Sequence, residues 1–357
     1  MLSRTADIPT FVQTTLASAV AERASDVHVE PQADECEIRF RIDGLLQPHA
    51  VLPLDTGAAM VTRLMVMAQL LTYRRDVPQE GRAAIALDAS GTINTRISIM
   101  PTTHGLRAAV RLPAELTQPR SLEALQLDPP AESLIERFIS SDSGVLMIVG
   151  PAGAGKTTTA YAILEAIRNH QPGVSIVSLE DPVERDLPGI TQVQVEPFGQ
   201  LTYATALRSL LRQDPQVLML GEIRDAETAS IAIQAALSGH RLICTLHAAD
   251  AAQAVARLLE MQLEPYQISS SLFGVIGQRL LRRRIDTGYR GRVPVCEAVG
   301  FDDALQQLTA DRASAAELRS AYRANPSFQS LHRVAADRVA QGITDEAEVA
   351  RVLGGQV

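Results

Sequence analysis

Two hydrophobic patterns follow one another along this chain of 357 residues, and they predict two kinds of structure. In the first third, apolar and polar residues alternate on either side of Asp43-Gly44, which predicts a β-hairpin closed by a tight turn. Apolar residues at helical spacing predict one helix before this hairpin and another after it. The expected helices cover 1–20 and about 57–71, and the expected strands cover 36–41, 45–51, 92–99 and 106–112. Residues 1–112 are therefore expected to form a small α+β domain.

The pattern changes after a stretch at 113–119, which carries two prolines and is expected to be a linker. Beyond it, helical segments alternate with short continuous apolar runs, which is typical of a mostly parallel α/β sheet. The expected strands cover 145–149, 174–179, 217–220 and 241–246. The second domain is therefore expected to cover 120–357, with a helical C-terminal region at about 302–357.

Composition narrows the class of protein. A hydrophobic fraction of 46% and a charged fraction of 21% are those of an ordinary globular chain. The net charge of −8 argues against extensive nucleic-acid binding. No apolar run approaches the ~18 residues that span a bilayer, and the N-terminus lacks a signal-peptide pattern. The chain is therefore expected to be cytoplasmic, with any membrane contact made through partners.

The strongest chemical signal surrounds Lys156, the single lysine among 33 lysine and arginine residues. It lies in 150–157, which fits G-x-x-x-x-G-K-[ST] between an apolar strand and a helix expected at 158–168. In such a loop, backbone N–H groups turn toward phosphates, the ammonium reaches the β/γ-phosphates, and the Thr157 hydroxyl is placed to ligate Mg²⁺. A planar arginine fork is too broad for this loop, which explains why a lysine remains here. The predicted nucleotide-contacting residues are Gly150, Pro151, Ala152, Gly153, Ala154, Gly155, Lys156, Thr157 and Thr158.

Three predicted strands of the second domain run into titratable residues. They lead to Glu180, Glu222 and His247, and His240 lies just before the third strand. The carboxyl ends of parallel strands meet at the ligand-binding edge of a sheet. Glu222 is expected beside the P-loop strand, from where a carboxylate reaches Mg²⁺ and the attacking water. A solvated strand end or a structural histidine is the alternative for each residue taken alone.

Three segments at these strand ends carry a resemblance to a known family. They are Glu180-Asp-Pro-Val-Glu184, Leu218-Met-Leu-Gly-Glu-Ile-Arg-Asp225 and Gly239-His-Arg-Leu-Ile-Cys-Thr-Leu-His247. They resemble the Asp box, Walker B motif and His box of the type II/type IV secretion ATPase superfamily. Further segments similar to motifs of that family lie at 24–31, 78–82, 96–105 and 288–297. The resemblance covers roughly residues 10–350 and points to the secretion and pilus-assembly branch.

This resemblance implies a RecA-like P-loop ATPase domain preceded by a smaller, PAS-like α+β domain, with the chains forming a hexamer. ATP would lie between the RecA-like domain and the N-terminal domain of a neighbouring chain. Arg96 and Arg111 would reach across to the nucleotide phosphates, where an arginine in trans contributes roughly 10³-fold or more. The alternative for both arginines is cross-strand pairing with carboxylates.

The resemblance also implies catalytic roles. Lys156 would hold the β/γ-phosphates, and Glu222 is the first choice to polarise the lytic water, with Glu180 second. Thr157, Glu222 and Glu180 are expected around Mg²⁺. His240 and His247 are expected to sense the γ-phosphate or the neighbouring subunit.

The chain also departs from the family pattern. Assembly ATPases of this branch carry a tetracysteine zinc insert, whereas 278–284 here runs directly into the Gly-Tyr-x-Gly-Arg motif that begins at Gly288. The cysteines, at Cys36, Cys244 and Cys296, form no C-x-x-C pair, so buried free thiols and no zinc are expected. The chain is expected to lack the extra N-terminal domain of larger members, which leaves the anchoring mode open. The Arg282-Arg-Arg284 run is expected to end a helix, or else to face a membrane or partner.

The expected function is ATP hydrolysis that powers assembly of type IV pilus or type II secretion pseudopilus filaments. The work would be done on an inner-membrane platform protein, which would hold the ATPase peripherally at that membrane. A retraction motor of the same superfamily is the first alternative. A nucleotide-gated scaffold with little turnover is the second, although intact Glu180, Glu222, Arg96 and Arg111 argue against it. A DNA-pumping ring is disfavoured because the chain is acidic and lacks an aromatic-basic groove.

Overall fold

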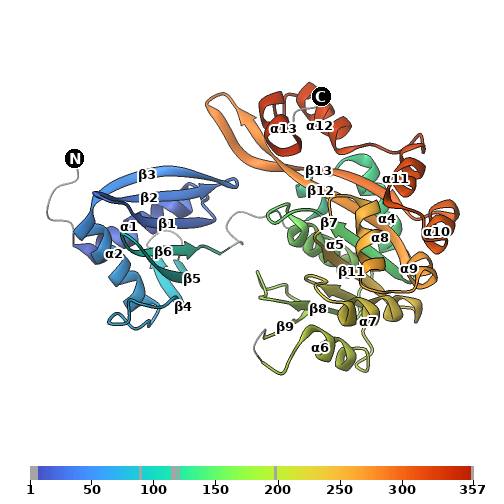
Figure 1. The fold of residues 1–357 in the computed structure, drawn as a ribbon, viewed down its shortest axis with the longest axis horizontal. Coiled ribbons are helices and arrows are strands. Elements are labelled where there is room, and N and C mark those ends of the chain that lie inside the picture. The colour runs from blue at the N-terminus through green and yellow to red at the C-terminus, as the bar shows by residue number, and fades with distance from the viewer. Residues whose placement is uncertain (1–6, 88–90, 114–118, 120, 197–198, 355–357) are drawn as a thin grey trace. The chain divides into compact units, whose positions relative to one another are not determined.

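Two separate β-sheets, each with its own hydrophobic core, organise the chain (Figure 1). The computed structural model describes residues 7–87, 91–113, 119, 121–196 and 199–354. They divide into two units, Met1–Gln118 and Pro119–Val357. Most of the predicted linker at 113–119 falls outside the described residues, so it stays a prediction.

The first unit is an antiparallel sheet with strand order β3-β2-β1-β6-β5-β4. Its strands are β1 (Asp26–Pro31), β2 (Glu35–Ile42), β3 (Leu45–Pro53), β4 (Gln79–Leu87), β5 (Gly91–Thr102) and β6 (Gly105–Arg111). Its helices are α1 (Ile8–Ala21) and α2 (Leu54–Met67). Apolar side chains from both helices and from the sheet form one buried cluster. The α+β architecture predicted for this region is confirmed.

Strands β1 and β4 are absent from the sequence prediction. In β4 the inward positions begin with a small residue, since Ala83, Ile85 and Leu87 are buried while their neighbours are exposed. Ala83 weakens the period-two signal because alanine is a poor marker of a buried strand. In β1 the period-two signal is short, because Val27 and Val29 are flanked by polar residues that are themselves partly or fully buried.

The second unit has a seven-stranded sheet with strand order β13-β12-β7-β11-β10-β8-β9. All neighbours pair in parallel except β12 and β13. Its strands are β7 (Gly144–Val149), β8 (Ile176–Glu180), β9 (Thr191–Gln194), β10 (Val217–Leu220), β11 (Arg241–Leu246), β12 (Leu272–Ile285) and β13 (Gly288–Gly300). The predicted α/β class is confirmed.

Helices cover both faces of this sheet (Figure 1). They are α3 (Leu122–Leu125), α4 (Pro129–Ile139), α5 (Lys156–His170), α6 (Tyr203–Leu210), α7 (Ala226–Leu237), α8 (Ala251–Glu260), α9 (Pro265–Ser271), α10 (Asp303–Ala310), α11 (Ala315–Arg323), α12 (Leu331–Ala340) and α13 (Glu346–Leu353). Strand β7, in the interior of the sheet, serves both cores, because Val145 and Met147 belong to one cluster while Leu146 and Ile148 belong to the other. No helix within the described ranges combines the length and apolar character needed to cross a membrane.

The hairpin formed by β12 and β13 is the largest correction to the sequence prediction. The Arg282-Arg-Arg284 run lies on β12 and does not end a helix. The first half of β12 pairs with β7 and β13 and is buried, so its apolar residues do not alternate with polar ones. Its arginines begin after the pairing with β7 has ended, where the hairpin projects from the sheet (Figure 1). There Arg282 pairs with the fully buried Glu348 of α13.

Candidate nucleotide site

The predicted phosphate-binding loop joins the interior strand β7 to α5, the longest helix of the second unit. β7 ends at Val149 and α5 begins at Lys156, with Gly155 in the left-handed conformation at the helix N-cap (φ 86°). The first N–H groups of α5 have no intrahelical acceptor, so they are available to an anion. Nζ of Lys156 donates to the carbonyl oxygens of Gly150 at 2.9 Å and Pro151 at 3.0 Å. Thr157 and Thr158, half-buried, follow in the first turn.

The close approach of Gln278 on β12 explains two glycines of the loop. A Cβ on Gly150 would lie 2.6 Å from the carbonyl oxygen of Gln278, and one on Gly155 would lie 2.9 Å from its Nε2. Oε1 of Gln278 accepts a hydrogen bond from Thr159 at 2.8 Å, and Nε2 donates to the carbonyl of Ala154 at 2.7 Å. One buried amide side chain therefore holds the loop to the start of α5.

Burial and nearby charge set the state of the loop lysine. Lys156 is 9% exposed. Burial lowers its pKa, the Glu222 carboxylate raises it, and Arg279 lowers it again. An ammonium whose neighbours are backbone carbonyls gains from an added anion, because phosphate oxygens are stronger acceptors than carbonyl oxygens. The residues present therefore fit a nucleotide phosphate.

Register brings a histidine next to this loop. Val149 pairs with Leu246 of β11 on one side and Gly277 of β12 on the other. His247 is the first residue after β11, and its Nδ1 lies 3.2 Å from the carbonyl oxygen of Gly150. The expectation that Glu222 follows the strand beside the P-loop strand is wrong, since β11 separates β10 from β7.

Glu222 nevertheless reaches the site through His247. Its Oε1 lies 2.9 Å from Nε2 of His247, and its Oε2 accepts from Nε of Arg224 at 2.6 Å. Arg224 also donates to Asp181 at 2.9 Å, and the bond to Glu222 raises the pKa of Arg224. The Glu222 side chain is 20% exposed and that of His247 is 43% exposed. A carboxylate, a histidine and a lysine thus meet at one accessible edge of the sheet.

Comparison with known proteins agrees with this geometry. The family model described as "Type II/IV secretion system protein" matches residues 2–351. The chain belongs to that family.

Curated relatives include secretion and pilus proteins. The chain is 38% identical to the type II secretion system protein HxcR of Pseudomonas aeruginosa, with 96% of this chain and 76% of the relative covered. It is 36% identical to the type II secretion system ATPase E of Vibrio cholerae, with 97% and 75% covered. It is 35% identical to the type IV pilus assembly ATPase PilB of Thermus thermophilus, with 95% and 42% covered. The predicted family and the predicted ATPase class are confirmed.

A solved structure of the pilus retraction motor PilT with bound ADP is also similar to this member of the type II/IV secretion family. It has a TM-score of 0.68 and 26% identity, and the match covers 95% of this chain and 96% of that one. The RecA-like fold class expected from the resemblance is confirmed by neighbours of this kind.

The second candidate carboxylate of this family member, Glu180, has a different environment. It is 2% exposed, and its two oxygens accept hydrogen bonds from Tyr161, Ser178 and Gln192. Burial and the neighbouring Glu180 raise the pKa of Tyr161, so the phenol keeps its proton and donates. The Asp box therefore begins with a carboxylate that the protein itself saturates.

The structure does not bring His240 to the P-loop of its own chain. His240 precedes β11, whose first residue, Arg241, pairs with Gly144 at the start of β7. The P-loop follows the opposite end of β7, about 20 Å away at ~3.3 Å per residue. Nδ1 of His240 lies 3.0 Å from the carbonyl oxygen of Ala235.

Arg96 and Arg111 lie directly opposite each other in the first unit, on β5 and β6. Each contacts a carboxylate, Arg96 with Glu80 and Arg111 with Asp26. Cross-strand pairing therefore occurs, yet the Arg96 and Arg111 side chains are 50% and 66% exposed.

The sequence predictions also concern the three cysteines and the absence of a zinc site. All three cysteines are buried free thiols, as predicted. Across the described ranges, no three His, Cys, Asp or Glu side chains are grouped to hold a metal ion. A Mg²⁺ ion needs no such cluster here, because one hydroxyl, substrate phosphates and water can complete its shell. The absence of zinc stays a prediction.

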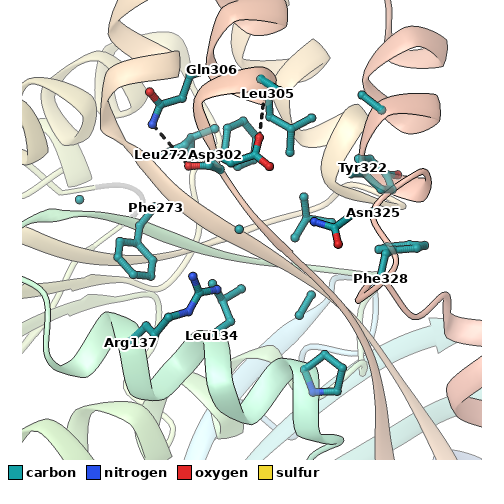
Figure 2. A pocket seen from close by; sticks show the side chains of 18 of the residues that line it. Leu134, Arg137, Leu272, Phe273, Asp302, Leu305, Gln306, Tyr322, Asn325 and Phe328 are labelled. Carbon is teal, nitrogen blue, oxygen red and sulfur yellow. Dashed lines mark hydrogen bonds between the residues drawn. The ribbon is translucent and has the colours of Figure 1, made fainter.

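A cavity of about 680 Å³ lies away from this site (Figure 2). Leu134 and Arg137 of α4, Phe273 of β12, and Tyr322 of α11 are among its lining residues. Gly144, at the start of β7, also lines the cavity. The cavity therefore lies at the amino end of this strand, whereas the P-loop follows its carboxyl end. This cavity is therefore separate from the nucleotide site at the P-loop.

Several residues at the site escaped the sequence prediction. Gln278, Tyr161 and Arg224 contact the P-loop, Glu180 and Glu222, respectively. The only sequence signal was position, since Arg224 lies two residues after Glu222 and Tyr161 lies one turn into α5.

Proposed function

We propose that this chain is the hexameric ATPase that powers assembly of type IV pilus or type II secretion pseudopilus filaments. It would act in the cytoplasm on an inner-membrane platform protein. The observation that carries the proposal is the meeting of Lys156, His247 and Glu222 at the carboxyl edge of the sheet. Relatives at 35–38% identity named for secretion and pilus assembly support the biological assignment.

The loop residues would bind the triphosphate. Lys156 exchanges its two carbonyl acceptors for phosphate oxygens, and the N–H groups at the start of α5 donate to the same anion. Thr157 and Glu222 would hold Mg²⁺, which when bound neutralises phosphate charge. Glu222 would orient and polarise the attacking water. His247 and Arg224 fix the direction of its carboxylate from two sides.

An arginine pair from the first unit of a neighbouring chain would complete the site. Arg82, Arg96 and Arg111 lie in one register row across β4, β5 and β6, on the sheet face not occupied by the core. Three guanidinium groups in a row form a surface suited to phosphates, since arginine binds their oxygens in bidentate geometry. We infer that Arg96 and Arg111 act in trans; at least half of each arginine side chain is exposed, so solvent screening weakens their ion pairs with Glu80 and Asp26.

A retraction motor is the second candidate, because the structure of PilT is similar over 95% of this chain. Assembly is favoured, since its curated relatives share more sequence with this chain than PilT does. Deleting the gene and counting surface filaments and secreted protein distinguishes the two. Loss of filaments is expected, whereas an excess would show retraction.

A mixing experiment tests the ring and the site together. Arg111→Ala and Lys156→Ala chains are each expected to release phosphate from ATP at least ~10³-fold more slowly than wild type. Mixed before assembly, they should recover partial activity, because some interfaces then combine an intact P-loop with an intact arginine. Steady-state phosphate release measures this. Mixtures that stay inactive would show that the arginines do not act across chains, and full activity of a monomer would exclude the ring.

A further inference from the structure

The short loop between β11 and α8, residues 247–250, is held by an arginine from a helix that lies far away in the sequence but contacts the loop. Asp250 ends the loop and caps α8, because its Oδ1 accepts from the backbone N–H of Gln253 at 2.8 Å. Its Oδ2 accepts from Nε of Arg319 at 2.8 Å and lies 2.7 Å from Nη2. Arg319 belongs to α11, 69 residues further along the chain. The Arg319 and Asp250 side chains are 29% and 17% exposed, so this contact is partly shielded from water.

A second arginine holds the same loop from the sheet. Arg279 lies on β12 just beyond its last pairing with β7. Its Nη2 donates to the carbonyl oxygen of Ala249 at 3.4 Å, and its Nη1 donates to the carbonyl oxygen of Gln278 at 2.9 Å. Burial lowers the pKa of Arg279, while Glu297 and Asp250 raise it. Arg279 therefore links the strand that supports the P-loop to the loop that follows β11.

The position of this loop sets the position of His247. His247 is its first residue, and its ring spans from the P-loop carbonyl of Gly150 to Oε1 of Glu222. Arg257 of α8 donates to the carbonyl oxygen of His247 at 2.9 Å, which ties the loop to the helix that Asp250 caps. A displacement of Asp250 therefore moves both the helix start and the histidine backbone. Shifts of about 1 Å at such groups can cost ~10²-fold in rate.

We propose that Arg319 and Arg279 are positioning residues for ATP hydrolysis. They hold residues 247–250 so that His247 remains in contact with Glu222. The proposal rests on the role of Glu222 proposed above. It also assigns a function to α11, because this helix supplies Arg319, which contacts Asp250 at the end of the loop.

Arg319→Gln is the decisive variant. Loss of the guanidinium is expected to lower kcat for ATP hydrolysis about 10-fold and to leave KM within about twofold. The reason is that residues 247–250 position the water-activating Glu222 more directly than they position the P-loop. Arg319→Lys keeps the positive charge but loses the two-point contact with Asp250, so its kcat should lie between those of wild type and Arg319→Gln. Arg333→Gln, which removes an exposed pair with Asp337 on α12, is the matched control and should leave both constants unchanged.

A double variant separates positioning from a general structural effect. In a His247→Ala background, Arg319→Gln is expected to cause no further loss of kcat, because the side chain it positions is gone. An equal loss in both backgrounds would show that Arg319 acts elsewhere and would overturn the proposal. A rise in KM with unchanged kcat would overturn it as well.

Hydrogen exchange tests the clamp independently of Glu222. The amide of Ala249 donates to Oε1 of Gln253, so its exchange reports on the loop. Faster exchange over 247–250 in full-length Arg319→Gln is expected, and unchanged exchange would refute the clamp itself. Normal hydrolysis by Glu222→Gln would instead contradict the proposed function and leave the exchange result standing.

Discussion

Two neighbouring strands, β8 and β10, lead to carboxylates that differ sharply in their surroundings. Both strands are fully buried and pair in parallel; Glu180 is the last residue of β8, whereas Glu222 lies two residues beyond the end of β10. Glu180 is covered by α5 and β9, which supply Tyr161 and Gln192 as donors. Glu222 directly follows the turn glycine Gly221, and its carboxylate contacts the partly exposed side chains of His247 and Arg224. The same sequence pattern thus produces one saturated carboxylate and one accessible carboxylate, because the elements packed over the strand end decide the outcome.

Glu222→Gln tests the accessible member and carries the largest expected effect. The amide keeps the size of the side chain but removes the basic oxygen that polarises water. Hydrolysis is expected to slow at least ~10²-fold while ATP still binds. Single-turnover phosphate release and equilibrium nucleotide binding measure the two quantities. Unimpaired turnover would show that Glu222 is a spectator like any solvated strand end.

The difference between these carboxylates was beyond sequence reasoning. The strand ends and the P-loop were predictable, because short-range apolar runs and an eight-residue motif specify them. Strand order was not, so the place of β11 between β7 and β10 was missed. The donors to Glu180 come from separate elements, since Tyr161 lies 19 residues before it and Gln192 lies 12 residues after it. Such contacts depend on tertiary packing that no local pattern encodes.

The β12–β13 hairpin shows the same limit on the fold. Gln278 contacts Thr159 across 119 residues and fixes the P-loop, yet in the sequence it only precedes an arginine-rich run that predicts the end of a helix. A strand buried between two neighbours is continuously apolar, so an alternation of apolar and polar residues does not identify it. The arginines then follow where its pairing with β7 has stopped.

Glu297 is another buried carboxyl group, and its surroundings differ from those of Glu180. It is 5% exposed, and no described residue hydrogen-bonds its Oε1. Burial raises its pKa to about 7, and Asp250 adds to the shift, whereas Arg323, Arg279 and Arg319 oppose it. A raised carboxyl pKa means that the folded state favours the protonated form. The cost of ionising Glu297 is therefore absent below pH 4.5, grows as pH rises, and is complete above about pH 7.

Glu297→Gln should remove that cost. At pH 8 the free energy of unfolding is expected to rise by about 2 kcal/mol, since each pKa unit corresponds to ~1.4 kcal/mol and the shift sets an upper limit near 3 kcal/mol. The gain should shrink as pH falls toward 5. Denaturant unfolding of wild type and variant at both pH values measures it. A gain that is equal at pH 8 and pH 5 would show that packing, not ionisation, is responsible.

Glu180→Gln carries the smallest expected effect and tests the saturated member directly. The substitution replaces an acceptor of three hydrogen bonds by an amide whose NH₂ group cannot accept the bonds made to the oxygen that it replaces. Unfolding should become easier by about 1–2 kcal/mol, because charge-assisted bonds in a buried site are lost. Hydrolysis should fall by less than ~10-fold, well short of Glu222→Gln, since Glu180 is only 2% exposed and accepts three hydrogen bonds from the protein, whereas the Glu222 side chain is 20% exposed and can be reached by water. Parallel measurement of unfolding and phosphate release in both variants decides the matter. If Glu180→Gln proves the slower enzyme, the roles of the two carboxylates are reversed, and hydrogen-bond saturation in the nucleotide-free chain does not predict which one activates water.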